Sequence, residues 1–226
     1  MALYAERTND LKTLRIGPWI KDRILLIDLG FYKYQVFTRI KENGGYFVSR
    51  LKSNANPLIL EVNRTYRGRS IEIQGKHLQD VLNNLKRQVL DVDVEVVFNR
   101  RAYQGKERKD SERFRLVAVY NADEEKYHLY ITNISTDLLK PEEVARLYGA
   151  RWEVEILFKE LKSKYALDVV PTANPQVIEA FIWIAVLTLL ISRRIHTIIR
   201  RLNPGVKVVR FTHLRWGTIF SEKAGY

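Results

Sequence analysis

Apolar residues follow a different pattern in each third of the 226-residue chain. In the first third, the short apolar run Ile24–Ile27 ends in a carboxylate, Asp28, which predicts a buried strand. Apolar positions at helical spacing within residues 31–41 predict a helix that the Asn-Gly-Gly at 43–45 ends, and residues 46–51 predict a second strand. This succession of strand, helix and strand indicates an α/β fold.

The middle third changes to alternating apolar and polar positions, the pattern of half-buried strands. Residues 92–98 alternate, and residues 114–120 and 127–134 predict a strand pair around the polar turn at 121–125. The basic stretch at 99–109 could follow a DNA backbone or form a solvated hairpin tip. We therefore expect a mostly β insertion over residues 53–136.

The last third is predicted to be helical. One helix should begin near Pro141 and run to about residue 165, and a long one should cover residues 176–202. The second contains an uninterrupted apolar run of twelve residues, 180–191. Because a bilayer span takes roughly 20 residues, this run favours a fully buried core helix, and we expect no membrane partner.

The amino-acid composition favours one class of binding partner and excludes several kinds of site. The net charge is +12, and the chain has no cysteine. The positive excess suggests a polyanionic partner such as nucleic acid, because each phosphate neutralised by Lys or Arg releases a counterion. The absence of cysteine excludes a disulfide framework, a Cys-based zinc site and a Cys nucleophile. No signal-peptide pattern opens the sequence, so we expect a cytoplasmic, nucleoid-associated protein.

Candidate chemistry concentrates in the helix predicted before residue 165. At 100° per residue, Tyr148, Arg151, Glu155 and Lys162 fall within roughly 60° of one another. The Glu155 carboxylate can hold a divalent metal ion while the side chains of Arg151 and Lys162 hold phosphates. The alternative is an exposed face with ordinary salt bridges, since Arg151 and Glu155 are four residues apart. A neighbouring apolar stripe that could bury against a sheet comprises Val154, Phe158, Leu161 and Tyr165.

The spacing Tyr-x2-Arg-x3-Glu-x6-Lys of these four residues resembles the YREK signature of insertion-sequence transposases of the DDE superfamily, the IS-four type. Two further blocks support the resemblance. Residues 27–32, followed by 46–52, are similar to the strand–Asp–x–Gly–Phe segment that carries the family's second catalytic Asp, together with its next strand. Residues 132–134 resemble the family's last insertion strand.

The resemblance implies an RNase H-like fold in which three carboxylates bind two divalent metal ions, Mg²⁺ or Mn²⁺. Asp28 and Glu155 would be two of these carboxylates, both catalytic and metal-binding. Tyr148, Arg151 and Lys162 would contact DNA phosphates at the transposon end. The resemblance implies double-stranded DNA as the partner, at transposon ends and target, and a second copy of the chain in a DNA complex.

The same resemblance divides the chain into an RNase H-like core, residues 1–52 and 137–226, and the β-rich insertion at 53–136. The family's first Asp has no match, since neither Asp10 nor Asp22 follows a β run. We therefore expect an N-terminally truncated transposase with its first strands missing, an incomplete metal site and little cleavage by this chain alone. The alternatives are a non-catalytic DNA-binding remnant that modulates a full-length transposase, and a structural or interaction protein whose basic charge is incidental.

Overall fold

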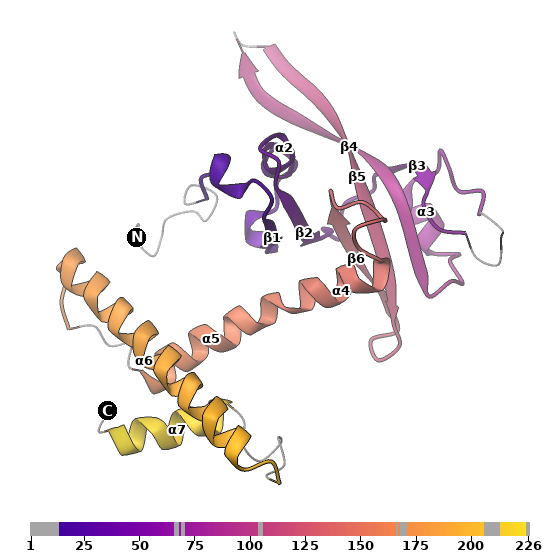
Figure 1. Ribbon diagram of the computed structural model, residues 1–226. Helices are drawn as coiled ribbons and strands as arrows, with labels where there is room; N and C mark the ends of the chain where they lie inside the picture. The colour runs from indigo at the N-terminus through magenta and orange to yellow at the C-terminus, as the bar shows by residue number, and fades with distance from the viewer. Residues whose placement is uncertain are drawn as a thin grey trace. The chain divides into compact units, whose positions relative to one another are not determined.

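The computed structural model describes residues 14–65, 68, 71–103, 106–165, 167, 171–205 and 213–224 (Figure 1). The chain divides between residues 151 and 152 into two compact units. The first unit contains a mixed sheet with its flanking helices, and the second is helical. The mixed α/β class expected from the sequence is confirmed.

Six strands form the sheet of the first unit, in the order β1-β2-β6-β5-β4-β3. β1 and β2 are parallel, and every other neighbouring pair is antiparallel. The strands are β1 (Ile24–Ile27), β2 (Tyr46–Arg50), β3 (Leu58–Val62), β4 (Val89–Tyr103), β5 (Lys106–Asn121) and β6 (Lys126–Thr132). The helices of this unit are η1 (Pro18–Ile20), η2 (Leu29–Phe31), α2 (Tyr34–Glu42), α3 (Leu78–Leu82) and α4 (Pro141–Gly149).

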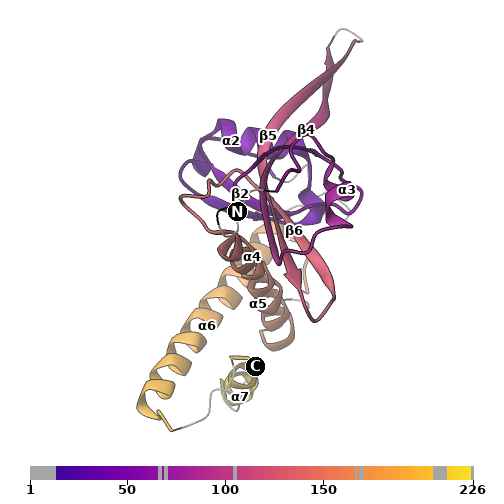
Figure 2. The same cartoon turned by 90° about the vertical axis from the view of Figure 1, so that its right-hand side faces the viewer.

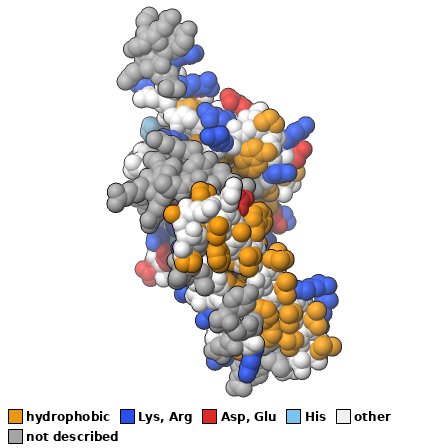
Figure 3. Space-filling view, turned by 90° about the vertical axis from the view of Figure 1, so that its left-hand side faces the viewer, with side chains coloured by type: hydrophobic (Ala, Val, Ile, Leu, Met, Phe, Trp, Pro, Cys, Tyr) orange, Lys and Arg blue, Asp and Glu red, His pale blue; other side chains and the backbone are white. Residues whose placement is uncertain are grey.

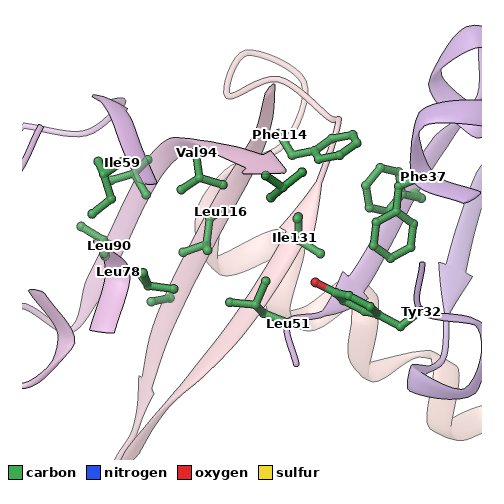
Figure 4. Packing of buried hydrophobic residues seen from close by; sticks show 14 of the residues in the cluster. Tyr32, Phe37, Leu51, Ile59, Leu78, Leu90, Val94, Phe114, Leu116 and Ile131 are labelled. Atoms are coloured by element: carbon green, nitrogen blue, oxygen red, sulfur yellow. The ribbon is translucent and has the colours of Figure 1, made fainter. Parts of the chain in front are cut away.

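Apolar residues cover both faces of this sheet. Because successive side chains of a strand point to opposite faces, neighbouring residues of β2 enter different cores. Phe47 stacks on Phe37 of α2, with ring centroids 4.3 Å apart, in the larger core that Figure 4 shows. Val48 packs on the other face with Val144 and Tyr148 of α4. The sheet therefore holds α4, which carries part of the predicted signature, against the strands that lead to Asp28.

The end of β6 is tied to the start of β2 by Asn133. Its side chain accepts a hydrogen bond from the backbone N–H of Phe47 (2.9 Å) and donates one to the carbonyl of Gly45 (2.8 Å). Gly45 has no room for a side chain, because an added Cβ would lie 2.6 Å from Cγ1 of Ile20. These contacts fix β2 beside β1, and so fix the strand end where Asp28 begins.

The β4–β5 hairpin is much longer than the alternating pattern predicted (Figures 1 and 2). Its outer part pairs polar residues, including Asn99 opposite Lys109, and Arg100 forms an ion pair with Asp110 at 2.5 Å. The described residues of the basic stretch at 99–109, residues 99–103 and 106–109, belong to the paired strands β4 and β5. Since β3 to β6 share one sheet with β1 and β2, the insertion boundaries at 53 and 136 stay a prediction.

The second unit consists of α5 (Arg151–Lys164), which it includes from Trp152 onward, α6 (Pro175–Leu202) and α7 (His213–Ala224). The single helix predicted up to residue 165 is interrupted at Ala150, whose N–H bonds to the carbonyl of Leu147, three residues back. The apolar core of this unit joins Leu161 and Tyr165 to Ala185 and Leu189 of α6.

The prediction that the run at 180–191 is a fully buried core helix is wrong for the described structure. α6 buries one stripe, Ala185, Leu189, Ser192 and His196, while Leu187 and Leu190 are each 59% exposed. By length and composition, α6 is apolar enough to cross a membrane, with a mean hydropathy of 1.8 over its most apolar window. The apolar run extends around the whole helix, so its sequence could not show which face lies inside.

Candidate functional site

Asp28 lies where β1 ends, and its carbonyl accepts the N–H of Phe31 in the short helix η2. Ile27 before it is buried and pairs with Ser49 of β2, whose hydroxyl donates to the Ile27 carbonyl at 2.9 Å. The backbone of Asp28 is therefore fixed by the sheet, while its side chain is about half exposed (53%). This places a carboxylate at the open end of a rigid strand.

Arg151, at the start of α5, faces that carboxylate. Its Nη1 lies 3.7 Å from Oδ1 of Asp28, and its guanidinium lies 5.7 Å from the ring centroid of Tyr148. The structure thus brings together three of the five predicted site residues, Asp28, Tyr148 and Arg151, all within the first unit. A cation beside a half-exposed carboxylate can neutralise it or, if released, bind a phosphate.

Tyr148 is largely buried (7% exposed) on the α4 face of the sheet, with its ring centroid 5.6 Å from that of Tyr130. Burial raises the pKa of the Tyr148 phenol, and the charge of Arg151 opposes this in part. The phenol therefore remains neutral at physiological pH, and its ring forms a support beneath the guanidinium. Arg50 of β2 also lowers the pKa of Tyr148, so a second cation belongs to this neighbourhood.

Glu155 and Lys162 lie on α5 in the second unit, where both side chains are exposed. Leu161 of this helix and Tyr165, just after its end, are buried as predicted, but against α6 rather than a sheet. Val154 and Phe158 of the predicted stripe are about half exposed, at 49% and 52%. Within the described ranges, no group of three or more His, Asp or Glu side chains could hold a metal ion.

Asp10 and Asp22 are the two acidic residues upstream of Asp28 that the sequence offers for the family's first Asp. Asp22 lies in the turn before β1, in the left-handed region with φ 57°, and the short helix η1 rather than a strand comes directly before this turn. Asp10 falls outside the described residues.

One ion pair near the site was not predicted from the sequence. Arg115 of β5 and Asp91 of β4 form a bidentate pair, at 2.7 and 2.8 Å, with side chains 4% and 1% exposed. Nη1 of Arg115 also donates to the carbonyls of Ile134, Ser135 and Leu139, in the segment that leads into α4. The pair thus anchors the beginning of the helix that carries Tyr148. A charged pair in an alternating strand looks solvated, so the pattern gave no signal for it.

Comparison with known proteins identifies the family. Residues 5–191 match the model of the family described as "Transposase DDE domain". The chain belongs to this transposase family. It is 27% identical over 207 residues to the transposase for insertion sequence element IS231F of Bacillus thuringiensis subsp. israelensis, a match covering 78% of this chain and 41% of that protein. It is 25% identical over 220 residues to the transposase for IS1151 of Clostridium perfringens, covering 85% and 46%.

The match to the transposase family includes all five predicted site residues, since each lies between residues 5 and 191. The chain spans less than half the length of these curated relatives. Their transposase function is consistent with the expected DNA partner, and the family matches the resemblance inferred from residues 27–32 and 148–162.

Proposed function

We propose that this chain acts in DNA transposition, binding transposon DNA and contributing two carboxylates to metal-dependent cleavage and strand transfer. The observation that carries the proposal is the placement of Asp28 at the end of β1 with Arg151 and Tyr148 beside it, in a member of the transposase DDE family. The spaced YREK residues and an RNase H-like arrangement of the first strands belong to the same proposal.

Asp28 and Glu155 are the residues that would hold Mg²⁺ or Mn²⁺. Their chemistry fits, because carboxylate oxygens are the ligands these hard cations prefer, and both side chains are open to solvent. When bound, a metal pair would activate water or a DNA 3′-OH for attack on a phosphodiester. No acidic residue of the sequence matches the third carboxylate that this chemistry needs, so we propose that the chain alone cleaves DNA weakly or not at all.

Arg151 and Lys162 would hold phosphates of the transposon end. Arg151 is suited to this because its planar guanidinium can bind two phosphate oxygens at once. Tyr148 would act mainly through Arg151, since the phenol is largely buried and its ring lies under the guanidinium. Such a protein would work at the DNA, in the cytoplasm near the nucleoid.

DNA binding should depend steeply on salt, because phosphate contacts release counterions. Arg151→Ala and Lys162→Ala should each weaken the binding of a labelled duplex and lower the slope of log K against log salt by about 1. Fluorescence anisotropy between low and physiological salt measures this slope. Arg64→Ala is the matched control, because Arg64 is an exposed cation already paired with Glu142 at 2.6 Å.

If log K of the wild-type chain hardly changes with log salt, Arg151 and Lys162 do not bind phosphates. The positive charge is then incidental, which fits a structural or interaction protein. If Arg64→Ala lowers the slope as much as Arg151→Ala does, the chain binds DNA through diffuse positive charge and has no specific site at Tyr148, Arg151, Glu155 and Lys162.

A non-catalytic protein that binds the same DNA and modulates a full-length transposase is the second candidate. The observation that favours it is that the described residues group no three acidic side chains. Cleavage by a mixture of this chain with the remaining part of a related transposase separates the two candidates.

A further inference from the structure

A cleft of about 310 Å³ lies between α2 and the outer part of the β4–β5 hairpin, and we call it the hairpin cleft. Phe98, which is 8% exposed, lines it together with three arginines: Arg39 of α2, Arg100 of β4 and Arg108 of β5. Figure 3 shows Lys and Arg side chains near the hairpin, in the upper part of the view. The basic stretch predicted at 99–109 therefore supplies two of the cations of a defined cleft.

Contacts between the two walls fix the shape of the hairpin cleft. Nε2 of Gln35 on α2 donates to the carbonyl of Asn99 on β4 at 2.5 Å. Lys41, also on α2, forms an ion pair with Glu112 of β5 at 2.7 Å. The hairpin is thus tied to α2 on both of its strands, so the arginines of the cleft are arranged before any ligand binds.

The arginines of the cleft differ in their acidic partners. Arg100 has two, Asp110 at 2.5 Å and Glu42 at 3.9 Å. Within the described part of the chain, neither Arg39 nor Arg108 forms an ion pair, and both side chains are exposed. Both nearby carboxylates are therefore engaged by one arginine, and two guanidinium groups at the same cleft are available to an anion.

The pairing of the hairpin also brings two of these charges together. Arg100 and Arg108 occupy directly opposite positions on the antiparallel strands β4 and β5. Like charges at opposite positions destabilise a strand pair, so this arrangement does not help the hairpin to form. A phosphate bound between them would replace repulsion by attraction, because its oxygens accept hydrogen bonds from both guanidinium groups. The pair therefore indicates a binding role rather than a stabilising one.

The register of the sheet places the hairpin cleft far from Asp28. Successive pairings across β2, β6 and β5 bring Ile27 level with Val92 of β4. Arg100 lies eight residues beyond Val92, in the direction that leads away from Asp28. At ~3.3 Å per residue, this is about 26 Å along the strands, which corresponds to about eight base pairs of a duplex. A phosphate in the cleft is therefore a different one from the phosphate near Asp28.

We propose that the hairpin cleft binds the phosphate backbone of double-stranded DNA, several base pairs away from the phosphate that reacts near Asp28. The inference rests on the proposed function for DNA as the partner. A duplex suits the cleft better than a small free phosphate, because Arg39 and Arg108 are exposed and would hold a single small anion weakly. A duplex instead gains from counterions released at every contact with a chain of net charge +12. Two separate contacts also set the direction in which the duplex crosses the sheet.

The salt dependence of DNA binding tests this inference, measured by fluorescence anisotropy with the full chain and a labelled duplex of about three helical turns. Arg39→Gln and Arg108→Gln should each lower the slope of log K against log salt by about 1, and the double variant by about 2. Lys109→Gln is the matched control. Lys109 is exposed and follows Arg108 on β5, but successive side chains point to opposite faces, so the slope should change less.

Urea unfolding without DNA separates a binding role from a structural one. Arg108→Gln should leave the free energy of unfolding unchanged or raise it, because it removes a like charge opposite Arg100. A clear loss of stability would show that Arg108 supports the hairpin, and would overturn the inference. Equal slopes for Arg108→Gln and Lys109→Gln would also overturn it, because the charge of the hairpin would then act diffusely.

Inorganic pyrophosphate tests the other source of phosphate. Micromolar binding of pyrophosphate in isothermal titration calorimetry, lost in the Arg39→Gln variant, would overturn a duplex as the ligand. The inference and the proposed function can fail separately. If Arg108→Gln lowers the slope while Arg151→Ala and Lys162→Ala do not, the hairpin cleft binds DNA and the phosphate roles of the signature residues are wrong. The reverse result would remove the hairpin cleft and keep the proposed function.

Discussion

Arg115→Met should lower the free energy of unfolding by about 3–5 kcal/mol, the usual cost of removing one partner from a buried ion pair. The substitution leaves the Asp91 carboxylate charged and enclosed, with its side chain 1% exposed. It also leaves the carbonyls of Ile134, Ser135 and Leu139 without the guanidinium that binds them. Methionine replaces the aliphatic stem of arginine with an apolar chain, so most of the loss would reflect the charge and its hydrogen bonds rather than a cavity.

Urea unfolding followed by circular dichroism measures this loss. Arg113→Met is the matched control, because Arg113 lies two residues away on β5 and pairs with Asp93 and Glu61 in solvent. It should have a much smaller effect, since exposed ion pairs contribute little. The double variant Asp91→Leu with Arg115→Met should recover part of the stability, because it leaves no unpaired charge. Equal losses for Arg113→Met and Arg115→Met would contradict the anchoring role.

The anchor also affects the candidate site. β5 is fixed in the centre of the sheet, and Arg115 binds the segment from Ile134 to Leu139 to it. α4 begins two residues later, at Pro141, and ends in the turn that places Arg151 near Asp28. A weakened anchor should therefore loosen Tyr148 and Arg151 together.

The sequence predicted most elements of the sheet because their patterns are local. Ile24–Ile27 and Tyr46–Arg50 are short apolar strands, and α6 was predicted within one residue of its ends. The outer β4–β5 hairpin was missed because its residues are polar. Cross-strand pairs such as Arg100 with Asp110 hold it together. Such pairs cannot be recognised in the sequence until the pairing register of β4 and β5 is known.

The candidate site was predicted from the spacing of four residues along one helix. This spacing does not determine which of their side chains the fold buries. Tyr148, Arg151, Glu155 and Lys162 share one helical edge in sequence, yet Tyr148 turns out to be a core residue while Glu155 and Lys162 are exposed. The contact of Arg151 with Asp28 joins residues more than a hundred positions apart, so no local pattern contains it. The prediction that α6 is fully buried was wrong for a different reason. A helix that is apolar on all sides does not show in its sequence which side has a partner.

Asp28→Asn should abolish metal-dependent strand cleavage, which we expect to need the part of a transposase that this chain does not cover. The design mixes the chain with the remaining part of a relative such as the IS231F transposase, and follows nicking of supercoiled DNA that carries the element's ends in Mg²⁺ or Mn²⁺. The carboxamide keeps the size of the side chain and removes the charge that would hold the metal. Losing about 4 kcal/mol of transition-state stabilisation corresponds to about a thousandfold in rate.

The control for Asp28→Asn is Asp22→Asn, which makes the same chemical change six residues earlier, in an exposed turn. Asparagine tolerates the left-handed backbone of that turn, so this variant should cleave like the wild type. Glu155→Gln should match Asp28→Asn, because both carboxylates would hold the same metal pair. Cleavage that survives Asp28→Asn, or that needs no divalent cation, would remove Asp28 from the reaction. Salt-dependent DNA binding without cleavage in any mixture would favour the non-catalytic DNA-binding protein instead.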